Sequence, residues 1–500
     1  IEIVRGPQSA LWGSEAIGGV IAVDGAAPGA GGSLAHVEAG SFRSRRGAAQ
    51  TSFGTADRGA SVAIGGQRSR GIDSFAGGGE RDGYSNLAAR AAGRYRLSDA
   101  LILGASGFAL KGLSEFDGFD PATFSRADTE DRTRNKLGAA RAFGTLGDSA
   151  TSFVTVSASL LGSQNRNLVA STEVNTTRAS RRTLELEAGH RIDRHHFIAA
   201  VEGEHEKFHA RDKAFGGFTN QDRSRRHRSL TLEWKMTDLG ALSTDLAVRH
   251  DVFSKFKDAT TVRGSALVAL GGGLTVAATY GQGIAQPTFF DLFGFFPGSF
   301  TGNPDLRPET SRGGELSLRY RAGPLGAALT YYRQRLRNEI IGIFAFPLSS
   351  TANADGTSRR QGIEVEVDYA PSDALRLAAN YAYLDASEPR GPGGSQVREQ
   401  RRPKHSGSVT LDGTQGRLTY GAAVAYSGAH LDTNFDTFPS QRVKLPAYWL
   451  ASARIAYRVA DPIELHLRVA NAFDDRYQDV FGYRTEGRSV HAGVRIAVGR

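Results

Sequence analysis

The chain has 500 residues and no cysteine, which excludes disulfide bonds, thiolate zinc sites, iron–sulfur clusters and a cysteine nucleophile. The formal net charge is +9, but the basic residues are dispersed and form no basic helix, zinc knuckle or RNP-like aromatic set, so we expect no nucleic-acid partner. A mean hydropathy of −0.32 and the lack of an apolar run near about 18 residues exclude a transmembrane helix, but they do not exclude a transmembrane β-barrel.

Residues 1–31 differ from the rest of the chain. Apolar stretches at Ile1 to Val4 and Gly19 to Val23 predict two short buried strands around a glycine-rich turn region. So short a piece cannot form a core alone, so we expect it to be the end of a larger domain. Pro28 to Gly32 is then the linker, and the chain divides into residues 1–31 and residues 32–500.

From about residue 33 onward the dominant pattern has period two, which predicts strands. Leu184, Leu186 and Ala188 share one side of a strand, while Glu185 and Glu187 take the other side. The same alternation recurs at residues 315–320, 363–368 and 463–469. Each strand therefore has one apolar face and one charged face.

Such segments number roughly 22 between Gly32 and the C-terminus, as in outer-membrane barrels. They are joined alternately by short turns, such as 97–100, and by long polar loops, such as 113–134 and 163–180. A soluble β-sandwich would not need so many long loops at one end, and we find no repeated motif of a propeller or solenoid. The sequence therefore predicts an all-β membrane protein, an antiparallel transmembrane β-barrel, for which lipopolysaccharide would suit the positive net charge.

The segment His205 to His209 matches the metalloprotease pattern His-Glu-x-x-His. That pattern binds zinc on a helix, where residues four apart are neighbours. Here it closes a predicted strand, on which four residues span about 13 Å, too far for one zinc ion. We therefore interpret the match as chance, and no other catalytic motif is present, so we expect no enzymatic activity.

A predicted long loop from Pro287 to Pro308 is unusually rich in aromatic residues. Exposed aromatic clusters often mark binding surfaces, so the loop either folds over the lumen as a ligand lid or rests on the barrel rim. The candidate ligand-contacting residues are Phe289, Phe290, Phe293, Phe295, Phe296 and Phe300.

Three segments resemble one known family. The run from Ile1 to Ile21, IEIVRGPQSALWGSEAIGGVI, closely resembles the end of the plug domain of TonB-dependent outer-membrane receptors. The segment from Gly302 to Thr310, followed by Glu315 to Tyr320, is similar to the mid-barrel signature of that family, and Asn471 to Asp474 to its near-terminal strand. Together these segments bracket nearly the whole chain.

The resemblance implies a 22-stranded outer-membrane barrel, here a monomer, that is occluded by a plug and that takes up a scarce nutrient. Residues 1–31 would be the C-terminal part of the plug, and the segment that contacts the TonB complex would lie upstream of Ile1. Cobalamin or another corrinoid is the expected cargo, with a ferric siderophore as the alternative. A passive porin and a soluble β-rich hydrolase remain alternatives from other classes.

Within the family, residues 33–124 look most like the cobalamin receptors, which carry calcium in two loops. The matching positions give Glu80, Asp82, Asp117 and Asp120 as candidate calcium ligands, and no other cofactor is expected. Clustered carboxylates suit calcium, which takes six to eight oxygen ligands. The alternative is that these aspartates and their glycine neighbours simply fill solvated turns.

The resemblance also implies a charged lock between plug and barrel. The family places a plug arginine of the Arg-Gly-Pro motif, here Arg5, against two barrel glutamates, for which Glu315 and Glu364 are the matching positions. A movable plug favours a few charge-assisted pairs over an apolar interface. The alternative is that both glutamates are ordinary water-facing residues of the lumen.

Overall fold

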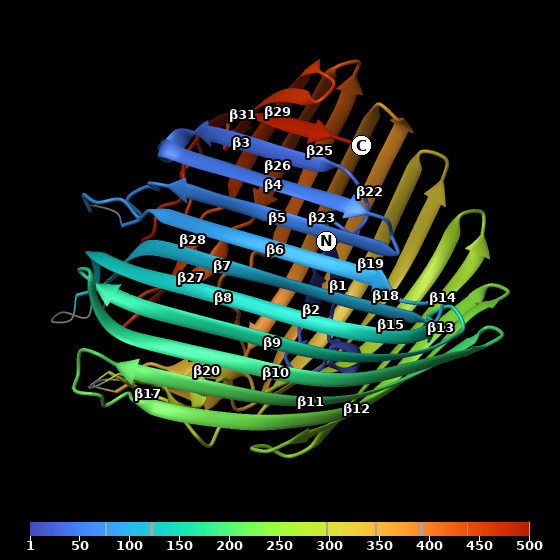
Figure 1. Ribbon diagram of the computed structural model, residues 1–500. Coiled ribbons are helices and arrows are strands. Elements are labelled where there is room, and N and C mark those ends of the chain that lie inside the picture. Colours follow the sequence, from blue (N-terminus) through green and yellow to red (C-terminus); the bar gives the residue numbers. More distant parts are fainter. Residues whose placement is uncertain are drawn as a thin grey trace.

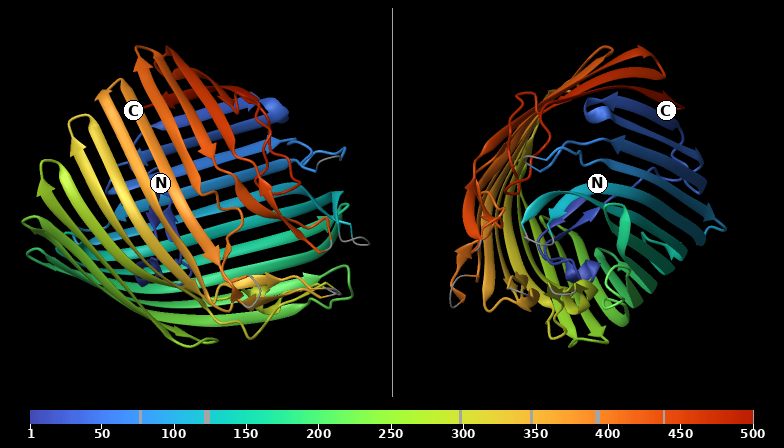
Figure 2. Two further views of the ribbon diagram at one scale, coloured as in Figure 1. Left: turned by 180° about the vertical axis from the view of Figure 1, so that it is seen from behind. Right: turned by 90° about the vertical axis from the view of Figure 1, so that its left-hand side faces the viewer.

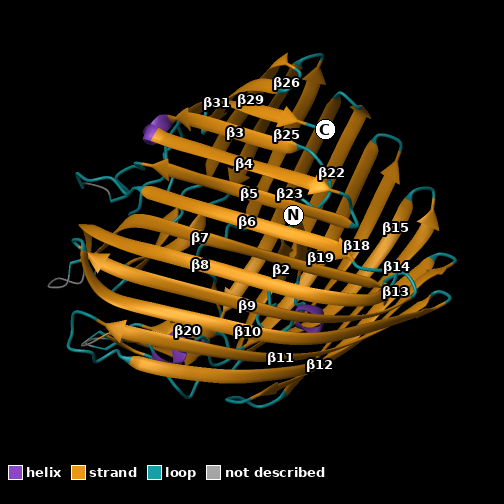
Figure 3. Ribbon diagram, in the orientation of Figure 1, coloured by secondary structure: helices purple, strands orange, loops and turns teal. Residues whose placement is uncertain are grey.

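The structure is a computed structural model that describes residues 1–75, 78–120, 125–296, 299–345, 348–390, 394–437 and 439–499, with only the backbone for residues 238, 239 and 295. Most of the described chain is strand, and the long strands form one closed barrel (Figures 1 and 3). The two α-helices in these ranges have four and five residues. No helix among the described residues is long and apolar enough to cross a bilayer.

The barrel wall consists of strands of 8 to 23 residues. They are β3 (Ser33–Gly40), β4 (Ser44–Gly54), β5 (Arg58–Ser69), β6 (Tyr84–Arg96), β7 (Leu101–Phe119), β8 (Arg126–Asp148), β9 (Ser152–Val169), β10 (Thr172–Ile192), β11 (His195–Asp212), β12 (Gln221–Leu239), β13 (Leu242–Phe253), β14 (Ala259–Gly271), β15 (Leu274–Ala285), β18 (Glu309–Ala322), β19 (Leu325–Arg337), β22 (Thr357–Ser372), β23 (Leu375–Glu388), β25 (His405–Gln415), β26 (Leu418–Ser427), β29 (Tyr448–Ala460), β30 (Ile463–Ala470) and β31 (Ser489–Val498).

Each wall strand pairs antiparallel with its neighbours in the chain, and the last strand pairs with the first. β31 lies along β3 in a register that runs from Ser33 opposite Val498 to Gly40 opposite His491. The two-residue β24 (Val397–Arg398) pairs only with the end of β23, so the described part of the closed sheet has 22 wall strands. The predicted fold class and strand number are therefore confirmed.

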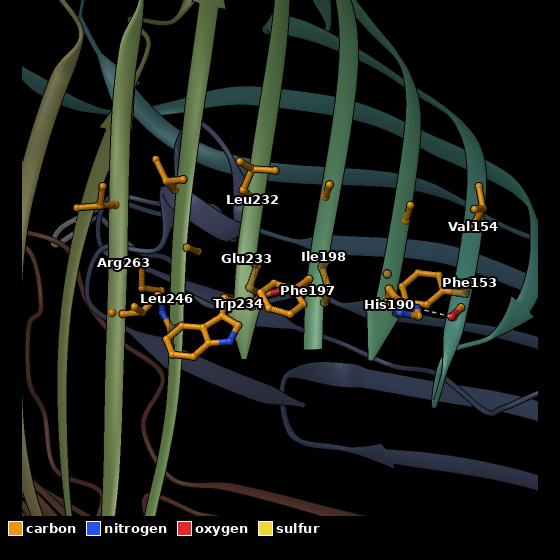
Figure 4. Close-up of a pocket in the computed structure, with 18 of the residues that line it drawn as sticks. Phe153, Val154, His190, Phe197, Ile198, Leu232, Glu233, Trp234, Leu246 and Arg263 are labelled. Carbon is orange, nitrogen blue, oxygen red and sulfur yellow. Dashed lines mark hydrogen bonds between the residues drawn. The ribbon is translucent and has the colours of Figure 1, made fainter. Parts of the chain in front are cut away.

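The two faces of the wall have the chemistry that the alternation predicts. On β10, Leu184 and Leu186 face outward and are 61% and 48% exposed. Glu185, between them, faces inward and accepts a hydrogen bond from Ser157 Oγ at 3.1 Å. Figure 4 shows part of the outward surface, where Phe197 and Trp234 help to line a groove of about 1090 Å³. Within this apolar band the outward side chains therefore face the lipid, while charged side chains such as Glu185 face the lumen.

Two segments expected to be long loops are mostly strand. In the 113–134 segment β7 continues to Phe119 and β8 begins at Arg126, while in the 163–180 segment only Ala170 and Ser171 separate β9 from β10. The prediction was wrong because it took polar residues as a sign of loops. Backbone pairing does not require apolar side chains, so the strands continue beyond the lipid into water.

The remaining long connections lie at one end of the barrel, and several of them contain short elements of their own. The loop between β15 and β18 holds α2 (Phe289–Phe293), β16 (Phe295–Phe296) and β17 (Phe300–Thr301). Two further hairpins occur, β20 (Ile340–Ile343) with β21 (Ser350–Asn353) and β27 (His430–Asn434) with β28 (Gln441–Leu445). The opposite end has short turns, so the two ends of the barrel differ as predicted.

The N-terminal segment, residues 1–31, lies inside the barrel (Figure 2). β1 (Glu2–Arg5) and β2 (Gly19–Ala22) form the predicted pair of short strands, with Arg5 opposite Gly19. The prediction that they are buried was wrong, because the pair lies in the open lumen and Ile3 and Ile21 are 65% and 68% exposed. The short helix α1 (Ser9–Trp12) lies between them in the chain and packs against β13, β14 and β15. The barrel lumen is therefore partly occupied by the chain's own first residues.

The outward placement of Leu186 gives a test of the fold. Leu186 lies midway between His190 and Arg182 on β10, so an arginine there would face the middle of the lipid. We expect Leu186→Arg to lower the free energy of unfolding by about 2–4 kcal/mol. The inward-facing Thr183→Arg, opposite Glu204, should cost much less. Urea titration of protein refolded into vesicles measures both, and equal losses would contradict the assignment of faces.

Candidate functional site

The N-terminal segment is fixed to the barrel wall by hydrogen bonds to its backbone and to a buried serine. The Ile284 N–H donates to Ser9 Oγ at 3.0 Å, and Ser9 is fully buried. Ser311 Oγ and Gln334 Nε2 donate to the carbonyl oxygen of Ile17 at 2.9 and 2.7 Å. These contacts come from β15, β18 and β19, so one side of the barrel holds the segment.

Two wall glycines allow the N-terminal segment to approach this closely. A Cβ on Gly281 would lie 2.2 Å from the carbonyl oxygen of Pro7, and one on Gly283 would lie 2.8 Å from Cα of Ile17. Real Cβ atoms do not approach other atoms so closely, so only glycine fits at these two positions of β15. The wall is therefore shaped to receive the segment.

Arg5 is at the end of β1 and faces two glutamates of β22. Its Nη2 donates to Glu366 Oε1 at 2.9 Å, and its Nη1 contacts the carboxylate of Glu364. Glu315, on β18, makes no ion pair with any described residue. The structure thus places Arg5 beside one of the two glutamates expected from the sequence and beside a second, Glu366, that was not expected.

A larger ionic network joins the segment to the wall near α1. Arg181 Nη2 lies 2.5 Å from Glu206 Oε1 and 3.4 Å from Glu15 Oε1, which belongs to the N-terminal segment. Arg225 also pairs with Glu206 and donates from Nη1 to the carbonyl oxygen of Pro287 at 2.9 Å. One carboxylate of β11 therefore links the N-terminal segment, the wall and the start of the long aromatic loop.

A second ionic network lies beside the first one, on β11, β12 and β13. Arg249 contacts Glu202 at 3.0 Å and Asp251 at 2.8 Å, and His227 Nε2 lies 2.7 Å from the same aspartate oxygen. Asp251 is fully buried, and the guanidinium of Arg249 lies against Gly13 of the N-terminal segment. Buried ions of this kind are stable only when they are paired, so the network holds its members in place.

Sequence reasoning missed both networks, although it contained a signal for them. Glu202, Glu204 and Glu206 alternate with apolar or outward residues on β11, so the period-two rule puts all three on the lumen face. The rule could not identify their partners, because Arg225 and Arg249 lie on other strands and the register between strands is not visible in the sequence.

The long aromatic loop folds into a compact cluster. Phe290 stacks on Phe300 at 5.2 Å between ring centroids, and Phe296 lies about 6 Å from both rings. The helix α2 starts with a capping box in which Thr288 and Asp291 bond to each other's backbone N–H groups at 3.1 and 3.0 Å. The side chain of Phe295 lies outside the described residues.

The other two candidate rings of this loop contact arginines and an aromatic residue of the wall. Phe289 stacks on Phe208 at 5.4 Å and lies 4.9 Å from the guanidinium of Arg225. Phe293 lies 4.2 Å from the guanidinium of Arg223, which is exposed. Arg223 is on the same inward face of β12 as Arg225, so aromatic rings and positive charge meet at the mouth of the lumen.

Three of the four candidate calcium ligands lie close to one another at the long-loop end. Ligand oxygens of Glu80, Asp117 and Asp128 lie within 4.8 Å of one another. The Ser74 hydroxyl is 2.5 Å from Asp82 Oδ2 and 2.9 Å from Asp117 Oδ2, which brings Asp82 to the same cluster. Asp128 was not expected from the sequence.

Asp120, the fourth candidate, lies beyond this cluster at the end of β7. Its backbone N–H donates to the carbonyl oxygen of Ser125 at 2.9 Å. The sequence did not show that the chain returns through β8 and brings Asp128, rather than Asp120, beside Glu80. Burial and the nearby carboxylates, Asp82 first among them, raise the pKa of Glu80 to about 7.

The His-Glu-x-x-His segment lies on β11, as expected. His205 lies opposite Arg226 in the register of β11 and β12. The side chain of His209, on the same outward face of β11, contacts the carboxylate of Asp222. The two histidines are four residues apart on an extended strand, so they cannot share one zinc ion. The interpretation as a chance match is consistent with this geometry.

Comparison with known proteins agrees with the barrel. Residues 31–472 match the family model described as "TonB dependent receptor-like, beta-barrel". The chain is similar to the siderophore receptor PirA from Acinetobacter baumannii, with a TM-score of 0.80 and 16% identity over 99% of this chain and 84% of that one.

Two further solved structures have the same fold. A point mutant of the ferric enterobactin receptor PfeA from Pseudomonas aeruginosa gives a TM-score of 0.78 and 15% identity over 99% of this chain and 84% of that one. The iron transporter FrpB from Neisseria meningitidis gives 0.80 and 12% over 99% and 86%. None of these three is a cobalamin receptor. The chain therefore belongs to the TonB-dependent receptor-like β-barrel family, whose members are transport receptors of the outer membrane.

Proposed function

We propose that this protein is an outer-membrane receptor that takes up a ferric siderophore with energy delivered through TonB. The observation that carries the proposal is the meeting of Arg223 and Arg225 with the phenylalanine rings of the long loop at the mouth of the lumen. Many ferric siderophore complexes are anionic and present flat iron-binding groups. Guanidinium groups and aromatic faces suit such a ligand.

The structural neighbours give independent support. The titles of the three solved structures name a siderophore receptor, a ferric enterobactin receptor and an iron transporter. A passive porin is the main alternative from another class. It is disfavoured because the N-terminal segment lies in the lumen and is held there by several hydrogen bonds and ion pairs.

The proposed ligand site at the mouth of the lumen can be tested with one matched pair of variants. Arg223→Ala should weaken binding of a ferric catecholate siderophore about tenfold or more, because a charge-assisted contact is worth about 1.5–3 kcal/mol. Lys207→Ala removes one positive charge from the outward face of the neighbouring strand at nearly the same height, and should change affinity less than twofold. Fluorescence titration of the detergent-solubilised receptor measures both, and an unchanged Arg223→Ala affinity would contradict the site.

We also propose that residues 1–31 are part of a movable plug and that Arg5 helps to hold it. The Arg5 side chain is 54% exposed, so each of its two ion pairs contributes only modestly. Modest contacts suit a segment that has to be released during transport. In this proposal the wall glycines allow the segment to pack closely against the barrel, and the ion pairs of Arg5 help to keep it there.

A double-mutant cycle tests this hold. We expect Arg5→Ala to couple with the double variant Glu364→Gln/Glu366→Gln by about 0.5–1 kcal/mol. Glu315→Gln, which removes a carboxylate from a neighbouring part of the lumen, should show no coupling. The readout is the urea midpoint at which the barrel becomes conductive in planar bilayers. Coupling to Glu315 and none to the β22 pair would contradict the proposal.

Cobalamin or another corrinoid remains the second candidate cargo, and the acidic loop cluster is the observation that favours it. The carboxylates of Glu80, Asp117 and Asp128 offer the hard oxygen ligands that calcium takes. Asp82 Oδ1 is buried and has no hydrogen-bond partner among the described residues, so a fourth carboxylate oxygen is available beside them. The donor set therefore fits a calcium ion that would tie the two loops together.

The raised pKa of Glu80 makes calcium binding depend on pH. Without a cation, ionisation of Glu80 is disfavoured in the folded loop, so loop stability falls as the pH rises from the ordinary pKa of 4.5 towards about 7. Calcium needs the ionised form, so its affinity should rise about tenfold between about pH 6 and pH 8. Calorimetric titration of the whole receptor with calcium chloride measures this.

The same titration has a matched pair of variants. Asp128→Asn should weaken calcium binding about tenfold, while Asp99→Asn, in a short turn at the other end of the barrel, should have no effect. Calcium-strengthened binding of cyanocobalamin would favour the corrinoid, whereas a siderophore response without calcium would favour the first candidate. Weak calcium binding at every pH would contradict the proposed metal site.

A further inference from the structure

The outward surface of β7 to β12 carries rows of like charges. Arg182, His205 and Arg226 lie directly opposite one another on three adjacent strands. Lys111 lies directly opposite Lys136 on β7 and β8. Like charges in such positions destabilise a sheet unless an opposite charge lies nearby.

No protein carboxylate neutralises these rows among the described residues. Arg182, Arg226, Lys111 and Lys136 are exposed and form no ion pair in this part of the chain. The nearest outward carboxylate on β12, Asp222, is already bound to Arg211 at 2.9 Å and to His209. The counter-charge for the rows must therefore come from outside the protein.

The arginine row lies at the height of lipid headgroups. Trp234 and Phe197 mark the other edge of the apolar band and are eight residues from Arg226 and His205 along their strands. Eight strand residues span about 26 Å, and the tilt of barrel strands reduces the height to about 20 Å. That height is close to the apolar thickness of an outer-membrane barrel, so the row meets the headgroups of the outer leaflet.

A groove in the outer wall lies at each row. The arginine groove, of about 870 Å³, is lined by Arg182, Arg226 and Arg228 and by small residues. Its floor is formed by Ala91, Gly107, Ala140, Ala142, Ala158 and Gly203. The lysine groove, of about 630 Å³, is lined by Lys111, Lys136 and Arg178, with Ala89, Ala109, Gly138 and Gly162 among its other residues.

The opposite wall has a comparable charge row but larger side chains below it. Arg312, Arg335 and Arg359 lie opposite one another on β18, β19 and β22. Below them the outward residues include Tyr331 and Tyr381, which are 47% and 43% exposed. Positive charge alone is therefore present on both walls. Among the described residues, charge combined with a floor of glycine and alanine is found on β6 to β12 and on the adjoining strands β4 and β5, where Arg45 lies opposite Arg68.

We propose that the arginine and lysine grooves bind an anionic glycolipid of the outer leaflet, with lipid A of lipopolysaccharide as the occupant. Its phosphates would neutralise the charge rows, for which guanidinium groups are well suited. An acyl chain would lie on the glycine and alanine floor, where its CH₂ groups contact the wall directly. The proposal concerns the lipid-facing wall and is independent of the cargo in the lumen.

The test uses the whole receptor, stripped of lipid in detergent, and bis-phosphorylated lipid A as the probe. The triple variant Arg182→Gln/Arg226→Gln/Arg228→Gln should retain about tenfold less lipid A in native mass spectrometry. Gly203→Leu should have a similar effect through the groove floor, since its added side chain starts in open space and leaves the charges intact. Heat-modifiable migration on gels confirms that each variant is folded.

The matched control is Arg312→Gln/Arg335→Gln/Arg359→Gln, which removes the same charge from the opposite wall. It should change lipid A retention less than twofold, and dephosphorylated lipid A should bind the unmodified receptor about tenfold more weakly. Equal losses in the two triple variants would overturn the groove site. Equal binding of phosphatidylglycerol and lipid A would show a general attraction for anionic lipid and would also overturn the proposal.

Discussion

The closed hydrogen-bonded sheet is the constraint on which the rest of this structure depends. A lipid bilayer offers no partner for a backbone N–H or C=O group, so a sheet that crosses it cannot have a free edge. The pairing of β31 with β3 removes that edge. Once the sheet is closed, each strand has one lipid face and one lumen face, and the alternation of apolar and charged residues follows.

A barrel of this size has a lumen too wide to be filled by its own side chains. The lumen is therefore polar, and the N-terminal segment in it is held mainly by hydrogen bonds and ion pairs such as those of Arg5, Glu15 and Ser311. An apolar interface of the same area would hold the segment more strongly and would expose apolar surface on release. Polar contacts can be exchanged for water, so they suit a segment that moves.

Local patterns in the sequence were sufficient for the fold class, the number of wall strands and the assignment of their faces. They were insufficient wherever two distant strands had to be aligned. Glu315 and Glu364 both belong to the lumen face, but the tilt and register of the barrel bring Glu366, not Glu315, level with Arg5. In the same way Asp128 reaches Glu80 because β8 returns beside β7, and polarity in the 113–134 segment concealed that both strands continue.

The same face rule explains why the charges outside the barrel differ from those inside. Inside, Arg181 and Arg225 are neutralised within the protein by the carboxylates of Glu206, Glu204 and Glu15. Outside, Arg182 and Arg226 are next to these residues in the chain but point away from every carboxylate of the lumen. The acidic residues of β10 and β11 near these positions face the lumen, and the outward Asp222 of β12 is already bound to Arg211 and His209. The outer face is therefore complete only in a membrane that supplies negative charge at the height of the arginines, and this makes the lipid part of the structure.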